Sequence, residues 1–273
     1  QSKELLLKIK KKYPNKILVS KIENYQGVLN SEEIIKNSDA VMIDRGDLSA
    51  EIGNNKLFNS IIKISKLTKK HGVPLIMATE NLENMILNNS PTKSEIISLE
   101  FNDLISVDKI MLSDETATSN NWKNILNWLD NYFKNFISPN NYKYFSDVYK
   151  KDKVEQSNQD NLWSSLDSSP NQSFLISTKS GAAIYKCKKF LNRPKIYIFT
   201  DNLRTYFLSR FFFNTRIFLV PKLSRRNVAK QILYFAKQYS KYLFEYNKVI
   251  TSIFVLNPQK GSRANAIYMI NKN

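Results

Sequence analysis

Short apolar runs alternate with longer segments whose apolar residues recur at helical spacing along the first half of the chain. The apolar runs lie at 17–19, 40–43, 73–77 and 109–112. After a basic helix at 3–12, the helical patterns lie at 30–36, 56–70, 92–105 and 122–133. Strands that alternate with helices predict a parallel sheet with right-handed crossovers. Four such units predict a small open sheet or half of an eight-stranded barrel, and the pattern alone does not separate the two.

Particular residues mark where several of these helices begin and end. Thr92 with Glu95, and Asn30 with Glu33, have the spacing of a capping box. Gly72 is placed to stop the helix that precedes it. The last helix of the first half is expected to bury one apolar face, made of Trp122, Ile125, Leu126, Leu129 and Phe133.

The segment 138–172 interrupts the pattern, because Asn, Ser, Gln and Asp dominate it. It predicts a linker or a poorly specified connection between a first domain over 1–137 and a second domain over 173–273. The strands predicted in the second domain lie at 174–177, 195–199, 216–220, 249–256 and 266–270. Its predicted helices lie at 181–191, 202–212 and 226–243, and a turn is predicted at 258–262.

The net charge of +17 is concentrated in the second half of the chain. Residues 1–140 hold 18 Lys and Arg against 17 Asp and Glu, whereas residues 141–273 hold 23 against 7. The second domain is therefore expected to attract anions: phosphorylated metabolites, nucleic acid or an acidic partner. A composition bias that enriches Lys, Asn and Ile explains part of this excess equally well. The aromatic residues fall mainly at core spacings and no RNA-binding signature is present, which argues against nucleic acid.

The composition excludes several classes of protein. The apolar fraction of 42% favours packed globular structure over a disordered basic chain. No window holds the roughly 18 consecutive apolar residues of a membrane-spanning helix. Cys187 is the only cysteine, so we expect no disulfide framework, no cysteine metal site and a reducing compartment. The first residues, without an initiating Met, indicate a processed chain or a piece of a longer one.

A polar or charged cluster follows each of the four strands predicted in the first domain. The clusters are Lys21-Ile22-Glu23-Asn24, Asp44-Arg45-Gly46-Asp47, Ala78-Thr79-Glu80-Asn81 and Ser113-Asp114-Glu115-Thr116. Parallel α/β units bind ligands at the carboxyl ends of their strands, so four such ends in succession predict one site. We call the edge formed by these four strand ends the rim. It carries a lysine, two separated carboxylates and a threonine, which favour a site for phosphate and a metal ion.

The order and spacing of these clusters resemble the pyruvate kinase family, which carries K-I-E-N, V-A-R-G-D-L-G, A-T-Q-M-L-E-S-M, P-T-R-A-E and M-L-S-G-E-T in succession. The corresponding residues here are 21–24, 43–49, 77–85, 91–95 and 111–116. In the second domain, Thr178-Lys179-Ser180-Gly181 and the Gly261-Ser262 turn resemble two further loops of the family. The resemblance implies an α/β fold made of the second half of a (β/α)8 TIM barrel, strands five to eight, followed by a three-layer α/β C-terminal domain.

The resemblance also implies the glycolytic transfer of a phosphoryl group from phosphoenolpyruvate to ADP, giving pyruvate and ATP. Lys21 would donate hydrogen bonds to the moving group, because negative charge spreads over its oxygens during transfer. Glu23 and Asp47 would hold Mg²⁺, with Mn²⁺ as a substitute, since both supply the hard oxygen donors that this ion prefers. The family also uses K⁺, whose ligands would lie in strands absent from this chain.

The rest of the implied substrate site lies on the second and third strand tips. Gly46 and Asp47 would hold the substrate carboxylate at the start of a short helix over 48–52, with Arg45 next to it. Thr79 would bond to the substrate and lie near the carbon that is protonated.

Four residues beside this rim depart from the family pattern. Three of them, Asp44, Glu80 and Asp114, add negative charge near an anionic substrate, and Ser49 replaces a glycine. Each added acid costs on the order of 1 kcal/mol unless a metal or an arginine offsets it. A divergent enzyme and a catalytically inactive relative with a regulatory or assembly role are therefore both open, and the retention of Lys21 favours the enzyme.

Two further roles stay open. Ser113 and Glu115 would either relay a proton or make structural hydrogen bonds. The loop Thr178-Lys179-Ser180-Gly181 runs from a strand into a helix, where backbone N–H groups bind phosphate, and in the family it holds a phosphorylated sugar effector. Ala182 and Ala183 remove hydroxyl donors there, so an unregulated domain or a plain helix start is the alternative.

The 273 residues alone are expected to be inactive, because four strands do not close the site. Family members are commonly tetramers, so the resemblance implies a homotetramer at full length. It also implies a cytoplasmic location, with a plastid-type organelle as the alternative.

Overall fold

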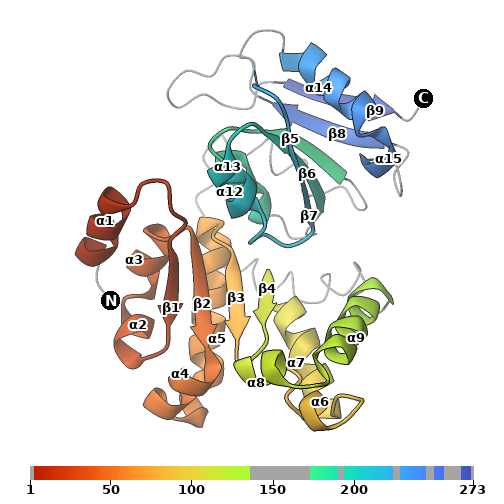
Figure 1. The fold of residues 1–273 in the computed structure, drawn as a ribbon. Helices are drawn as coiled ribbons and strands as arrows, with labels where there is room; N and C mark the ends of the chain where they lie inside the picture. The colour runs from red at the N-terminus through yellow and green to blue at the C-terminus, as the bar shows by residue number, and fades with distance from the viewer. Residues whose placement is uncertain are drawn as a thin grey trace. The chain divides into compact units, whose positions relative to one another are not determined.

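The computed structural model describes residues 3–135, 173–189, 194–223, 228–243, 249–254 and 266–271 (Figure 1). The chain divides into two compact units, Gln1–Asp152 and Lys153–Asn273. The segment 138–172 and the turn predicted at 258–262 lie outside the described residues, so the predicted domain limits stay predictions. Within the described residues, no helix is both long enough and apolar enough to cross a membrane.

Strands and helices alternate through the first unit. Its strands are β1 (Val19–Ile22), β2 (Ala40–Asp44), β3 (Leu75–Ala78) and β4 (Lys109–Met111). Its helices are α1 (Lys3–Lys12), α2 (Tyr25–Leu29), α3 (Ser31–Lys36), α4 (Arg45–Ile52), α5 (Asn54–His71), α6 (Asn84–Leu87), α7 (Lys93–Leu104), α8 (Asp114–Thr118) and α9 (Trp122–Asn135). The four strands pair in chain order and all pairs are parallel, so the predicted parallel α/β fold is confirmed.

The two faces of this sheet are covered unequally. Ile22 is fully buried, whereas its neighbour Lys21 is half-buried. The row that contains Lys21 crosses the sheet through Met42 and Ile76 to the exposed Lys109. The face of Ile22 is therefore the more fully covered of the two. All four strand tips point toward the same edge of the sheet, where α4 and α8 begin (Figure 1).

Of the residues predicted to mark helix ends, two predictions are confirmed and one is wrong. At α7 the predicted capping box is confirmed, because Thr92 and Glu95 bond reciprocally to each other's backbone N–H. Gly72 caps α5 in the left-handed conformation with φ of 73°, as predicted. The box predicted at Asn30 is wrong: Asn30 lies between α2 and α3 and makes no side-chain cap hydrogen bond. An extra helical turn before Asn30, which the pattern did not predict, replaces the free helix start that a capping box requires.

The closing helix α9 is rotated relative to its predicted face. Ile125 and Leu129 are buried as expected, but the third buried residue is Tyr132. Trp122, Leu126 and Phe133, which were expected in the core, are among the exposed residues. The buried stripe packs in one apolar cluster with Leu82, Met85 and Leu99. Contact with these residues, and not the width of the apolar stripe, decides which side of the helix faces inward.

The second unit contains a five-stranded sheet in the order β7-β6-β5-β8-β9. Its strands are β5 (Ser173–Ser177), β6 (Lys195–Thr200), β7 (Thr215–Leu219), β8 (Val249–Phe254) and β9 (Ala266–Asn271). Its helices are α12 (Ala182–Lys188), α13 (Leu203–Ser209), α14 (Val228–Gln238) and α15 (Ser240–Leu243). All pairs are parallel except β8 with β9. Phe199 lies in its core against Phe218, Phe235 and Tyr239.

Candidate functional site

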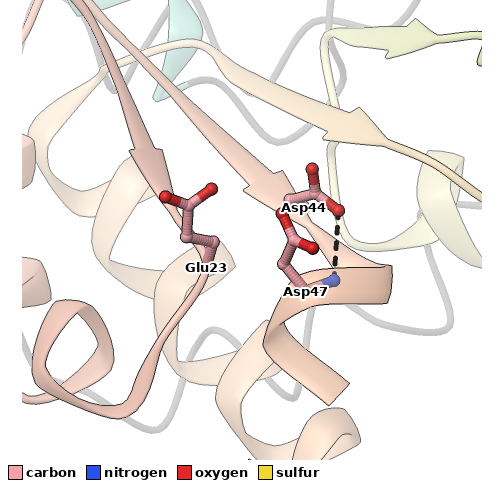
Figure 2. A group of neighbouring side chains, drawn as sticks. All are labelled: Glu23, Asp44 and Asp47. Carbon is pink, nitrogen blue, oxygen red and sulfur yellow. Dashed lines mark hydrogen bonds between the residues drawn. The ribbon is translucent and has the colours of Figure 1, made fainter. Parts of the chain in front are cut away.

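The first two strand tips bring Lys21, Glu23, Asp44 and Asp47 together. Figure 2 shows Glu23 at the end of β1, and Asp44 and Asp47 at the end of β2 and the start of α4. Helix α4 begins at Arg45, earlier than the predicted start at 48, because Asp44 caps it. The cap is the hydrogen bond that the Asp47 N–H donates to Oδ1 of Asp44, at 3.4 Å.

The ammonium group of Lys21 contacts three carboxylates. Its Nζ lies 2.6 Å from Oε2 of Glu23, 2.8 Å from Oδ2 of Asp44 and 3.1 Å from Oδ2 of Asp47. The hydrogen bond to Asp44, followed by that to Glu23, raises the pKa of Lys21 above its ordinary value. Lys21 is therefore a permanent cation at neutral pH and can donate hydrogen bonds but cannot act as a base.

The same carboxylates fit a divalent cation. One oxygen each of Glu23, Asp44 and Asp47 lies within 4.8 Å of the others, and carboxylate oxygens are the ligands that Mg²⁺ and Mn²⁺ prefer. The structure thus brings together the predicted pair Glu23 and Asp47. It adds Asp44, which the motif comparison had marked only as a departure. The position of Asp44 at the end of a strand next to β1 is the signal that could have identified it.

Asp44 is the most deeply placed member of this group, with 8% of its side chain exposed. Besides Lys21 and the Asp47 N–H, it accepts a hydrogen bond from Oγ1 of Thr79 at 3.1 Å. Burial acts to raise the pKa of Asp44, but the hydrogen bonds from Lys21, Asp47 and Thr79 outweigh it, and the pKa lies below its ordinary value. Asp44 is therefore a carboxylate at neutral pH.

Thr79 connects the second and third strand tips. Its Oγ1 accepts the N–H of Gly46 at 3.1 Å and also lies 2.7 Å from the carbonyl oxygen of Ala78. A hydroxyl has one proton, so it donates either to Asp44 or to Ala78. The predicted site residues Gly46 and Thr79 are therefore in direct contact.

The chain leaves β3 through a backbone in the left-handed region. Thr79, Glu80 and Leu82 have φ of 61°, 51° and 59°, which is unfavourable for side chains other than glycine and most of all for β-branched Thr. The buried guanidinium of Arg45 donates to the carbonyl oxygens of Thr79 and Glu80 and to Oδ1 of Asn81. Arg45 therefore holds this loop in place, and its predicted role beside the substrate carboxylate stays a prediction.

Asn81 was not predicted as a site residue, yet it joins two strand tips. Its Nδ2 donates to the carbonyl oxygens of Met77 at 3.2 Å and Met111 at 2.9 Å. At the fourth tip, Ser113 caps α8 by accepting the Thr116 N–H. Ser113 therefore has a structural hydrogen bond, one of the two roles left open for it.

The loop after β5 is built from local hydrogen bonds. Oγ1 of Thr178 accepts the N–H of Gly181 at 3.0 Å, and Nζ of Lys179 lies 3.1 Å from Oδ2 of Asp201. The strand order turns back at β5, and such switch points are where open α/β sheets bind ligands. The predicted effector site at Thr178, Lys179, Ser180 and Gly181 stays a prediction, in which an effector phosphate would compete with Asp201 for Lys179.

Comparison with known proteins bears on the first unit. Residues 6–124 match a family model described as pyruvate kinase, barrel domain. These residues are similar to the barrel domain of pyruvate kinases. The resemblance inferred from the strand tips is thus confirmed over this stretch, which contains all four polar clusters.

Three relatives are named pyruvate kinase. The protein of Borreliella burgdorferi is 41% identical over 104 residues, which is 38% of this chain and 22% of that protein. The protein of Encephalitozoon cuniculi is 44% identical over 100 residues, or 37% and 23% of the two chains. The cytosolic isozyme of Nicotiana tabacum is 41% identical over 103 residues, or 38% and 20%. The matched stretch thus spans about a fifth of the length of these pyruvate kinases.

Proposed function

We propose that this chain is part of an enzyme that transfers a phosphoryl group from phosphoenolpyruvate to ADP. The observation that carries the proposal is the contact of the Lys21 ammonium with the carboxylates of Glu23 and Asp47, at 2.6 Å and 3.1 Å. It joins a permanent cation to two hard oxygen ligands at neighbouring strand tips. All three residues lie in the stretch similar to pyruvate kinases.

We further propose that β1 to β4 correspond to strands five to eight of a TIM barrel, and the second unit to the C-terminal domain. Two observations support this: the strands pair in chain order, and one face of the sheet is less covered than the other. In a doubly wound sheet, the strand order would instead reverse at one point, and helices would cover both faces. Closing a barrel requires further strands on the edges β1 and β4, and these would also supply the K⁺ ligands.

In this proposal Lys21 binds the phosphoryl group. Because its raised pKa keeps it charged, it would donate to the oxygens on which charge develops during transfer. Glu23 and Asp47 would hold Mg²⁺ or Mn²⁺. The bound ion would neutralise charge on the phosphoryl group and orient it.

The second and third tips would bind the rest of the substrate. The N–H groups of Gly46 and Asp47 lie at the start of α4, where a carboxylate is favoured. Thr79 would bond to the substrate next to the carbon that receives a proton. An alkyl hydroxyl is a poor acid, so Thr79 would pass on a proton supplied from water.

Catalytic action is tested by Lys21→Met in the protein as the cell makes it. Phosphoryl transfer from phosphoenolpyruvate to ADP should fall by a factor of about 10² or more, as for loss of one electrostatic donor. The matched control is Lys56→Met, because Lys56 is exposed on α5 and its loss should leave turnover unchanged. Equal turnover of the Lys21→Met variant and the unaltered protein would refute the proposal.

Metal binding is tested on the 273-residue chain by electron paramagnetic resonance of Mn²⁺. Glu23→Gln and Asp47→Asn should each weaken Mn²⁺ binding by about tenfold or more, since each removes one ligand charge. Glu51→Gln, on the exposed side of α4, is the control. Undiminished Mn²⁺ binding in both site variants would contradict the assigned ligands.

A second candidate is a catalytically inactive relative with a regulatory or assembly role. The buried carboxylate of Asp44 among the proposed substrate donors favours it. The turnover assay decides between the two candidates, because the inactive relative would show no transfer in the unaltered protein. For either candidate we propose a homotetramer in the cytoplasm, a location supported by the cytosolic isozyme among the relatives, with a plastid-type organelle as the alternative.

A further inference from the structure

We propose that the carboxylate of Asp44 occupies the place of a substrate carboxylate and thereby lowers the affinity of this site for carboxylate ligands. The inference rests on the proposed function in one respect, namely that Lys21, Thr79 and the N–H of Asp47 are substrate-binding groups. Asp44 then determines ligand specificity from within the site.

The hydrogen bonds of Asp44 carry this inference. Its Oδ2 accepts from Nζ of Lys21 at 2.8 Å. Its Oδ1 accepts from the N–H of Asp47 at 3.4 Å, the bond drawn in Figure 2. The same oxygen lies 3.1 Å from Oγ1 of Thr79, which donates either to it or to Ala78. Both oxygens are thus engaged, and every donor belongs to the group assigned to the substrate.

An internal carboxylate has two advantages over a ligand in solution. It is tethered to β2, so it binds without the loss of translational and rotational freedom that a free ligand undergoes. It also caps α4, where the helix dipole favours a negative charge. A ligand carboxylate must therefore displace Asp44 from the N–H of Asp47 and break the helix cap.

The net charge around Lys21 also disfavours a carboxylate ligand. With Asp44 ionised, three carboxylates surround the single ammonium of Lys21, an excess of two negative charges. This excess matches a divalent cation and repels an anion. Removing Asp44 halves the excess and leaves the N–H of Asp47 and the hydroxyl of Thr79 free to bind an incoming carboxylate.

The test is a titration of the 273-residue chain with sodium pyruvate, followed through the amide NMR signals of Gly46 and Asp47. Asp44→Ser and Asp44→Ala should each bind pyruvate about tenfold or more tightly than the unaltered chain. The serine variant keeps a side-chain oxygen that can cap α4, so it tests the inference even if the alanine variant does not fold. Glu51→Gln is the control, because Glu51 is an exposed acid on α4, and its affinity should equal that of the unaltered chain.

Two results would overturn the inference. One is an unchanged pyruvate affinity in a folded Asp44→Ser variant. The other is a gain in affinity for inorganic phosphate without a gain for pyruvate, which would place Asp44 at a phosphate position instead. The proposed function fails separately: if the Asp44 variants gain pyruvate affinity while Lys21→Met leaves phosphoryl transfer unchanged, the inference stands and the proposed enzyme activity does not.

Discussion

The buried guanidinium of Arg45, at the start of α4, donates a hydrogen bond to the backbone carbonyl oxygen of Thr79, just beyond the end of β3. The same group also bonds Glu80, Asn81 and Ser98. A planar fork of five donors suits several acceptors at fixed angles. Arg45 therefore joins two strand tips and fixes the left-handed segment that presents the Thr79 hydroxyl to Asp44.

Replacing Arg45 by lysine should destabilise the first unit although the positive charge is kept. An ammonium cannot reach all of these acceptors, and each buried acceptor left unpaired costs about 1–3 kcal/mol. Urea unfolding should show this loss, and hydrogen exchange at Glu80 and Asn81 should become faster. An Arg45→Lys variant as stable as the parent, with unchanged exchange, would show that charge alone holds the loop.

Glu80→Gly should stabilise the protein, because Glu80 is exposed with φ of 51°. Glycine adopts this conformation without the steric penalty of a side chain. The gain should be about 0.5 kcal/mol after the larger chain entropy of glycine in the unfolded state is included. The matched control is Glu51→Gly inside α4, which should destabilise by about 1 kcal/mol. Thermal unfolding of both variants checks the opposite signs, and a loss of stability at both positions would contradict strain at Glu80.

The substitution Lys21→Met should lower the free energy of unfolding at neutral pH. This loss of stability should become smaller in acid. The raised pKa of Lys21 means that its contribution is present below its ordinary value of 10.5 and is lost as the pH rises through the folded-state value. The lowered pKa of Asp44 means that its contribution is present above its ordinary value of 3.8 and lost as the pH falls through the folded-state value. Both contributions are therefore complete between these limits.

Because Lys21 is 40% exposed, solvent screening reduces the expected loss at pH 7 to on the order of 1 kcal/mol. The difference between Lys21→Met and the parent should narrow as the pH falls below 3.8 and through the lower folded-state pKa of Asp44, because protonated Asp44 no longer pairs with Lys21. Urea unfolding from neutral to acid pH measures this difference in stability, with Lys56→Met as the control. A difference that stays constant with pH would indicate lost packing and not lost charge.

Thr92→Ala should destabilise α7 by about 1 kcal/mol, since it removes the side-chain acceptor of the Glu95 N–H. Thr92→Ser keeps the hydroxyl and should stay within about 0.5 kcal/mol of the parent. Thermal unfolding measures both variants. Equal destabilisation by serine and alanine would mean that the methyl group of Thr92, and not its hydrogen bond, stabilises the helix start.

Local patterns in the sequence determined the elements and the chemistry of the first unit. The alternation of apolar runs with helical stripes predicts the parallel sheet, and the Thr92–Glu95 spacing predicts the cap of α7, because both depend on residues close together along the chain. The polar clusters at the strand tips predict the resemblance to pyruvate kinase for the same reason: each cluster is a short contiguous motif. A local pattern fails where a neighbouring element changes the boundary, as α2 does at Asn30.

Only the tertiary structure decided which side chains meet at the rim. Asp44 was a departure from a motif, and strand pairing places it between Lys21 and Thr79. The motif of Arg45 did not predict that its guanidinium holds the loop after β3. The rotation of α9, which buries Tyr132, has the same origin. Register and packing join residues distant in the chain, and the hydrogen bonds of a buried charge depend on those distant partners.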